Sequence, residues 1–189
     1  MFLKFKYTII LLFIISCKPV EFIKPITIDY STFENISINA NQLILNNKYD
    51  PIFSEDNIEY QLNNPPSKLI IDWINENFET FGNENKFVIN ILDASISKKE
   101  IENTDAKKFE DKEIFQYEVF LLVEYELYSD SDYLIANTTV ETTRSTTSRK
   151  FISLNENDLI INDLLNNSLK DFTNETKMLI KTYMNEYLK

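Results

Sequence analysis

The sequence predicts an α+β fold, in which two helices pack on one face of an antiparallel sheet of about four strands. Residues 115–127 alternate between two sets of side chains, as a strand with one buried face does. Two other segments, 67–81 and 153–189, space their apolar residues along one face of a helix. The expected order of elements is therefore β-(β)-α-β-β-β-α.

The first expected helix begins after Pro65 and Pro66, with Ser67 as its N-cap. Its apolar face consists of Leu69, Ile70, Trp73, Ile74, Phe78 and Phe81. Gly82 follows this stripe and is the residue type that most often ends a helix. We therefore expect the helix to end at Gly82, with Trp73 in the core.

The second expected helix begins at Ser153, with Glu156 three residues later in a capping-box pattern. Its apolar stripe consists of Leu159, Leu164, Leu165, Leu169, Phe172, Leu179, Tyr183 and Tyr187. Neither Pro nor Gly occurs from Ser153 to Lys189, so a single long helix is the simplest interpretation.

Short strands are expected at 26–28, 36–38 and 43–45, before the first helix. After that helix, a strand is expected from Phe87 to about Ser97, followed by a charged loop over 98–112. The strand over 115–127 comes next.

A turn over 129–132 leads to a Thr-rich strand over 133–149. Short links should make the last three strands antiparallel. Both helices, each with one apolar face, should cover the side of the sheet that holds Tyr117 to Leu127.

The opposite side of the sheet is the expected partner surface, because helices on one side leave the other side open to water or to a partner. Its predicted residues are Glu118, Phe120, Leu122, Glu124 and, from the following strand, Arg144. Phe120 and Leu122 make this face more apolar than water contact alone requires. The alternatives are an ordinary surface, coverage by the N-terminal segment, and cross-strand pairing of Arg144 with the glutamates.

The composition excludes several classes of enzyme. The chain has no His, one Cys and one Gly. It therefore lacks the residues of Ser-His-Asp and Cys-His hydrolases, His-ligated zinc enzymes, P-loop NTPases and dinucleotide-binding folds. Acidic pairs such as Asp130 and Asp132 lack the spacing of an EF-hand loop. We expect no cofactor, no metal site and no enzymatic activity.

The N-terminus has the pattern of a lipoprotein export signal. Lys4 and Lys6 precede an apolar run over 7–15, which has the length of a signal peptide and is too short to span a bilayer. The run ends in Ile14, Ile15, Ser16 and Cys17, which looks like a lipobox. The sequence therefore predicts a signal peptide over 1–16, a tether over 17–25 acylated at Cys17, and one α+β domain over 26–189.

The net charge argues against binding to nucleic acid. The formal charge is −11, and it becomes −13 once 1–16, with its two lysines and no acid, is removed. Such a surface repels phosphate backbones and disfavours adsorption to anionic lipid.

Three stretches carry a resemblance to known proteins: the helix around Trp73, the segment 92–96 (LDASI), and the run from Thr142 to Ser145 that leads to 154–156 (LNE). Over most of the mature chain the sequence resembles a family of small, uncharacterised lipoproteins of alphaproteobacteria, which implies no activity. The element order is also similar to the lipoprotein that plugs the lipopolysaccharide-assembly barrel and to auxiliary lipoproteins of ABC-type transporters.

These observations together predict a non-catalytic binding or assembly module of the cell envelope. Its expected partners are the membrane, through lipid on Cys17, and another envelope protein. Lys18 after the acylated cysteine favours the outer membrane, facing the periplasm, in bacteria that sort lipoproteins by this residue. The alternatives are a carrier of lipid or of a hydrophobic small molecule, and an enzyme that works without His.

Overall fold

The computed structural model describes residues 28–108 and 111–189. The expected signal peptide (1–16), the tether (17–25) and Cys17 lie outside the described residues. The strands are β1 (Ile36–Asn39), β2 (Gln42–Asn47), β3 (Phe78–Phe81), β4 (Lys86–Glu102), β5 (Glu113–Tyr128) and β6 (Leu134–Arg149). The helices are α2 (Pro66–Asn77) and α3 (Leu154–Tyr183), with three 3-10 turns, η1 (Tyr30–Thr32), η2 (Glu59–Gln61) and η3 (Asn185–Tyr187).

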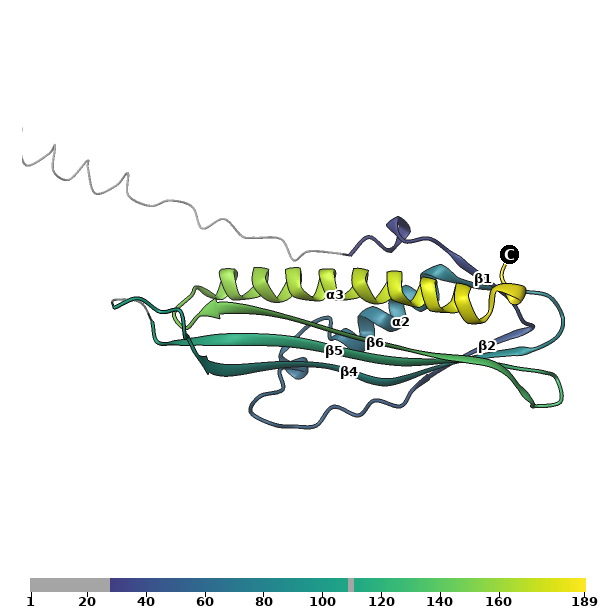
Figure 1. Cartoon of the computed structure of the whole chain (residues 1–189), viewed down its shortest axis with the longest axis horizontal. Helices are drawn as coiled ribbons and strands as arrows, with labels where there is room; N and C mark the ends of the chain where they lie inside the picture. The colour runs from purple at the N-terminus through teal and green to yellow at the C-terminus, as the bar shows by residue number, and fades with distance from the viewer. Residues whose placement is uncertain (1–27, 109–110) are drawn as a thin grey trace, which may run out of the picture.

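The main sheet has the strand order β2-β4-β5-β6 and confirms the α+β prediction (Figure 1). The last three strands are antiparallel, as expected from their short connections. The expectation of a purely antiparallel sheet is wrong, because β2 pairs parallel to β4. A parallel pair needs a crossover, and the chain segment with α2 and β3 provides it. A second small sheet pairs β1 with β3 in parallel.

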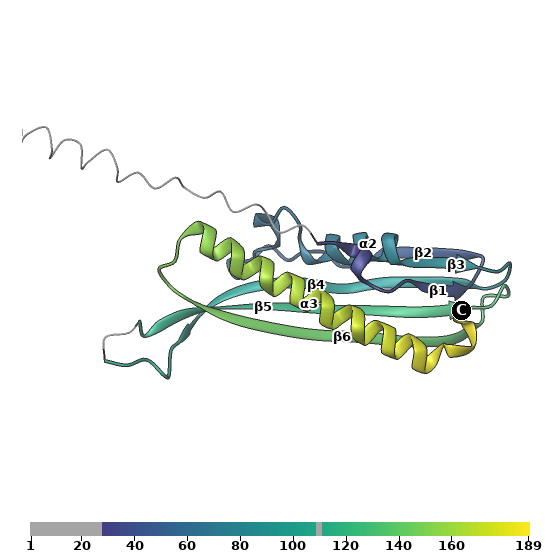
Figure 2. The same ribbon diagram turned by 90° about the horizontal axis from the view of Figure 1, so that it is seen from above.

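Both helices lie on the same side of the main sheet, as predicted (Figures 1 and 2). They meet through Trp73 of α2 and Phe172 of α3, whose rings pack edge to face with centroids 5.7 Å apart. Phe78 stacks on Tyr125 of β5 with centroids 6.2 Å apart, and it also contacts Trp73. This aromatic cluster joins both helices to the sheet in one core.

The alternation along β5 is confirmed. Six inward side chains are at most 2% exposed: Tyr117, Val119, Leu121, Val123, Tyr125 and Leu127. The residues between them are all half-buried on the other side. Burial of one face at every second residue is what a strand with helices on one side requires.

The long helix α3 forms with Ser153 as its N-cap, as predicted, but it ends at Tyr183 and is followed by η3 rather than continuing to Lys189. The Ser153 Oγ accepts a hydrogen bond from the Glu156 N–H at 3.2 Å. Two buried tyrosines of β5 hold the helix along its length. The Tyr117 hydroxyl donates to Asn157 Oδ1 at 2.7 Å, and the Tyr125 hydroxyl lies 3.2 Å from the Thr176 hydroxyl.

The first helix differs from the prediction at both ends. Pro65 is the N-cap and Pro66 the first helical residue, so Ser67 is not the cap. The missing N–H of a proline costs nothing at this position. The helix ends at Asn77 rather than at Gly82, since the chain turns into β3 at Phe78.

Asn77, the last residue of α2, is buried and hydrogen-bonded to the segment before β1. It is 2% exposed, and its Nδ2 donates to the carbonyl oxygens of Tyr30 and Phe33 at 3.2 Å each. These bonds tie the end of the helix to η1. Gly82 instead lies in the turn between β3 and β4, with φ 103°, where a Cβ would clash with the Asn39 side chain.

Two further boundaries differ. β4 continues to Glu102, so the first five residues of the expected loop over 98–112 belong to a strand, and β5 begins at Glu113, two residues earlier than expected. Of the expected strand 26–28, only Ile28 is described, and it lies outside any strand but packs against the core. Within the described residues, no helix has the length and apolar character needed to cross a membrane.

Candidate functional site

The side of the sheet turned away from α2 and α3 is the candidate site, and we call it the open face. Glu118, Phe120, Leu122 and Glu124 of β5 lie on it, as predicted, and all four are half-buried. Their neighbours follow from the register of β4 and β6, because directly opposed residues of antiparallel strands point to the same side. Strand β5 therefore forms the middle of this face.

Arg144 is a correction to the predicted surface. It lies opposite Val119, on the helix side of the sheet. Its Nη1 is 2.5 Å from Oδ2 of Asp171 on α3, so it pairs neither with Glu118 nor with Glu124. The register shift between Leu127 and Tyr128 helps to set which residues of β6 face the helices, and that shift is not visible in the alternation of the sequence.

The centre of the open face is a small apolar area with polar neighbours. Phe120 lies between Ser95 of β4 and Thr143 of β6. Leu122, the next outward residue, lies between Asp93 and Glu141. Two apolar side chains ringed by hydroxyls and carboxylates resemble the core and rim of a small protein interface.

One end of the open face holds a hydrogen-bonded polar network around Asn90. Asn90 is 1% exposed, and its Nδ2 donates to Glu124 Oε2 at 3.0 Å and to Glu126 Oε2 at 2.8 Å. Its Oδ1 accepts from Asn46 Nδ2 at 3.0 Å. The amide thus holds two glutamates of the same strand in place.

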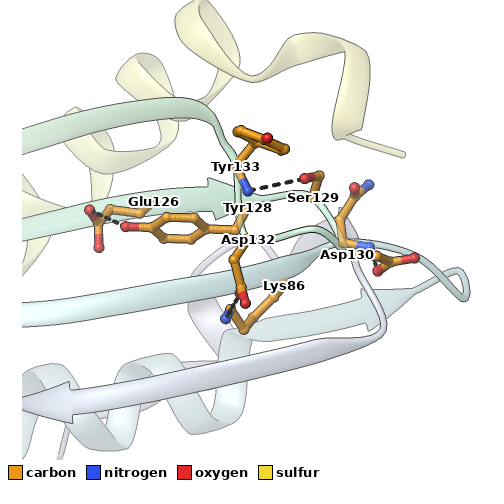
Figure 3. Close-up of polar contacts among 8 residues, drawn as sticks. Lys86, Glu126, Tyr128, Ser129, Asp130, Asp132 and Tyr133 are labelled. Carbon is orange, nitrogen blue, oxygen red and sulfur yellow. Dashed lines mark hydrogen bonds and ion pairs between the residues drawn. The ribbon is translucent and has the colours of Figure 1, made fainter.

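Tyr128 extends this network towards the β5–β6 turn (Figure 3). Its hydroxyl donates to Glu126 Oε1 at 2.9 Å, and this bond to a carboxylate raises the pKa of Tyr128. Lys86 lies 5.4 Å from the centroid of the Tyr128 ring and pairs with Asp132 at 2.7 Å. The turn is therefore fastened to the start of β4 by side chains.

The acids of this turn have protein partners. Asp132 pairs with Lys86 (Figure 3), and Asp130 Oδ1 accepts the Asn85 N–H at 3.0 Å. In the described ranges 28–108 and 111–189, no group of three or more Cys, Asp or Glu residues is placed to hold a metal ion. The turn acts as a mechanical junction between two hairpin ends.

Glu59 is a buried acid that the sequence analysis missed. It is 3% exposed, and its Oε1 accepts the Tyr49 hydroxyl at 2.7 Å and the Ile96 N–H at 3.1 Å. Burial, together with the Glu59 carboxylate, raises the pKa of Tyr49 well above its usual value. The carboxylate fastens the segment between β2 and α2 to β4.

The same segment extends the β4 edge beyond the end of β2. The Ile58 N–H donates to the Ile96 carbonyl at 3.1 Å, and the Lys98 N–H donates to the Asp56 carbonyl at 2.8 Å. Phe53, 86% exposed, stacks on Tyr60 with ring centroids 5.0 Å apart. The apolar residues over 46–64 follow neither a helical nor a strand period, so the sequence alone does not predict this arrangement.

Comparison with known proteins does not assign the chain to a family. No protein-family model and no curated protein matches the chain. A minor lipoprotein of Acinetobacter baumannii is similar to it, with 13% identity and a TM-score of 0.37 over 72% of this chain and 90% of that one. A neuraminyllactose-binding hemagglutinin homologue from Helicobacter pylori has 12% identity and a TM-score of 0.39 over 89% of this chain and 98% of that one. The resemblance to alphaproteobacterial lipoproteins stays a prediction.

The Asn90 network gives a first prediction. In the wild type, the Asn90 amide donates hydrogen bonds to the carboxylates of Glu124 and Glu126. In the Asn90→Asp variant, a third carboxylate replaces this amide. Loss of both donors and the added repulsion should lower the free energy of unfolding by about 2–4 kcal/mol at pH 7. Urea unfolding of the chain from residue 18 onward measures this change.

The deficit should depend on pH with a definite sign. Crowding raises the pKa of these carboxyls in the folded variant above that in its unfolded state, so the deficit is full at neutral pH. The part of the deficit that comes from repulsion should disappear as the pH falls below about 3, where the carboxyls are protonated in both states. Asn63→Asp, with the same charge change on an exposed loop, is the control. A deficit that grows on acidification would contradict the network.

Proposed function

We propose that this chain is a lipid-anchored, non-catalytic binding module of the cell envelope, which docks another envelope protein on its open face. The anchor is proposed from the lipobox-like end at Cys17. The non-catalytic part rests on the absence of His and the single Cys and Gly. Lys18 supports an outer-membrane location that faces the periplasm.

The structure of the open face is the observation that carries the docking proposal. Both helices bury the inward face of β5, whereas Phe120 and Leu122 remain half-buried on the outward face. Specific interfaces bury apolar side chains at the centre and keep polar residues at the rim. The ordered glutamates held by Asn90 would give such an interface direction, because their positions are fixed before a partner arrives.

Where the described residues of the two helices meet the middle of β5, little room remains for the alternative, a carrier of lipid. Between the helices and the sheet, the cavity beside Ile70, Val119, Leu121 and Leu169 measures about 10 Å³. This volume corresponds to about one water molecule. The aromatic cluster of Trp73, Phe78 and Tyr125 fills the neighbouring space. The open face therefore supports a protein partner better than the core supports a lipid.

The anchor is tested by metabolic labelling with radioactive fatty acid in the native bacterium. Label is expected on the wild-type chain and none on Cys17→Ser, because the thioether to diacylglycerol needs the thiol. Several acyl chains, at about 0.8 kcal/mol per buried CH₂, should also keep the wild type in the membrane fraction. An unlabelled wild type, or a labelled Cys17→Ser variant, would refute the anchor.

The docking surface is tested by site-specific photo-crosslinking in intact cells. A photoreactive residue at Leu122 should give an adduct of one discrete size with an envelope protein. The matched control position is Met178, an apolar residue of α3 that is 52% exposed. Adding Phe120→Asp should abolish the Leu122 adduct, since a carboxylate at the centre of an interface loses its hydration. An adduct at Met178 but not at Leu122 would move the interface to the helices.

A further inference from the structure

A groove with three lysines lies where the C-terminal end of α3 meets β1. It measures about 450 Å³, and it is lined by residues 34–37 on one side and by residues of α3, η3 and the chain end on the other. The Lys189 N–H donates to the Ser37 carbonyl at 3.2 Å, and Leu188 forms a bridge with Ile38. Figures 1 and 2 show this end of the chain beside β1. Backbone contacts therefore build one wall of the groove.

The charge of this groove is opposite to that of the chain. Lys177, Lys181 and Lys189 line it, and Glu34 is the single acidic side chain among its described lining residues. The whole chain carries −11. Salt screens charges beyond about 8 Å at physiological ionic strength, so an anion in the groove responds mainly to these lysines. We call this site the lysine groove.

Glu34 shows that the lysine groove favours an anionic group. Its carboxylate accepts a hydrogen bond from the Lys177 ammonium and forms an ion pair with it. The hydrogen bond from Lys177, and also the charge of Lys181, lower the pKa of Glu34. The carboxylate therefore acts as an internal anion that competes with any external one. Within the part of the chain that the structure describes, Lys189 forms no ion pair with an acidic side chain, and its Nζ lies 5.9 Å from the centroid of the Phe81 ring.

The proposed anchor would keep the domain close to a membrane surface. Ten residues lie between Cys17 and Ile28, and the eleven steps from one to the other span at most about 40 Å in a fully extended chain. We propose that the lysine groove binds the phosphate of an anionic lipid headgroup, an inference that rests on the anchoring proposed above. A lysine near a membrane surface contributes about 1 kcal/mol to the attraction for anionic lipid.

Calorimetric titration of the purified mature lipoprotein in neutral detergent tests this proposal. The three probes are short-chain phosphatidylglycerol, short-chain phosphatidylcholine and inorganic phosphate. Binding of phosphatidylglycerol alone is expected. Equal binding of both lipids would overturn the proposal, because the zwitterionic headgroup lacks net charge. Inorganic phosphate that binds as tightly as phosphatidylglycerol would also overturn it, since the ligand would then be a free anion.

Substitutions with opposite expected effects sharpen the test. Lys181→Gln with Lys189→Gln should weaken phosphatidylglycerol binding about 25-fold, at about fivefold per lysine. Glu34→Gln should tighten it several-fold, because the internal competitor is removed. The control, Lys48→Gln with Lys99→Gln, changes the net charge equally at two exposed positions and should leave the affinity unchanged. Equal weakening by both double variants would show that net charge, not the groove, sets the affinity.

The mass of the protein used for titration separates this inference from the proposed function. If the preparation carries the acyl chains and phosphatidylglycerol does not bind, the lysine groove proposal fails and the anchor stands. If the acyl chains are absent from the native protein, the anchoring proposal fails independently of the titration.

Discussion

The packing of α3 along the inward face of β5 is the interaction on which the rest of the structure depends. Two tyrosine hydroxyls of β5, at Tyr117 and Tyr125, contact Asn157 and Thr176 of α3. Eight residues of strand span about 27 Å and nineteen residues of helix about 28 Å, so the two elements match in length between these contacts. Phe172, fully buried between them, meets Trp73 of the second helix. The two helices thereby bury one face of the sheet.

This asymmetry leaves the other face available for recognition. An antiparallel sheet is stable with only one face covered, which a parallel sheet rarely is. The outward residues of β5 are free of the core, yet they are not uniformly polar. Glu124 and Glu126 are held by Asn90 at one end, and Phe120 and Leu122 follow towards the middle. A face with a fixed polar end and an apolar centre can orient a partner as well as bind it.

The strict alternation of β5 made its two faces predictable from the sequence, and the long stripe after Ser153 predicted α3 with its cap. The end of α2 was not predictable, because Phe78 and Phe81 fit a helical stripe and a strand equally well. Residues 78–81 form strand β3 because they pair with β1, which is distant in sequence. The side occupied by Arg144 depends on the hairpin register, and the role of Glu59 depends on a loop without period. Each failure concerns a contact between distant segments, which local patterns do not encode.

The central claim is that the open face is accessible in the isolated protein and covered in the envelope. Thiol labelling with a water-soluble maleimide tests it directly, because Cys17 is the single cysteine of the sequence and the proposed acylation would block its thiol. Leu122→Cys should react rapidly in the purified protein and at least about tenfold more slowly in intact envelopes. Leu121→Cys, 2% exposed on the helix side, should stay unreactive in both. Equal labelling of Leu122→Cys in the purified protein and in envelopes would contradict the account.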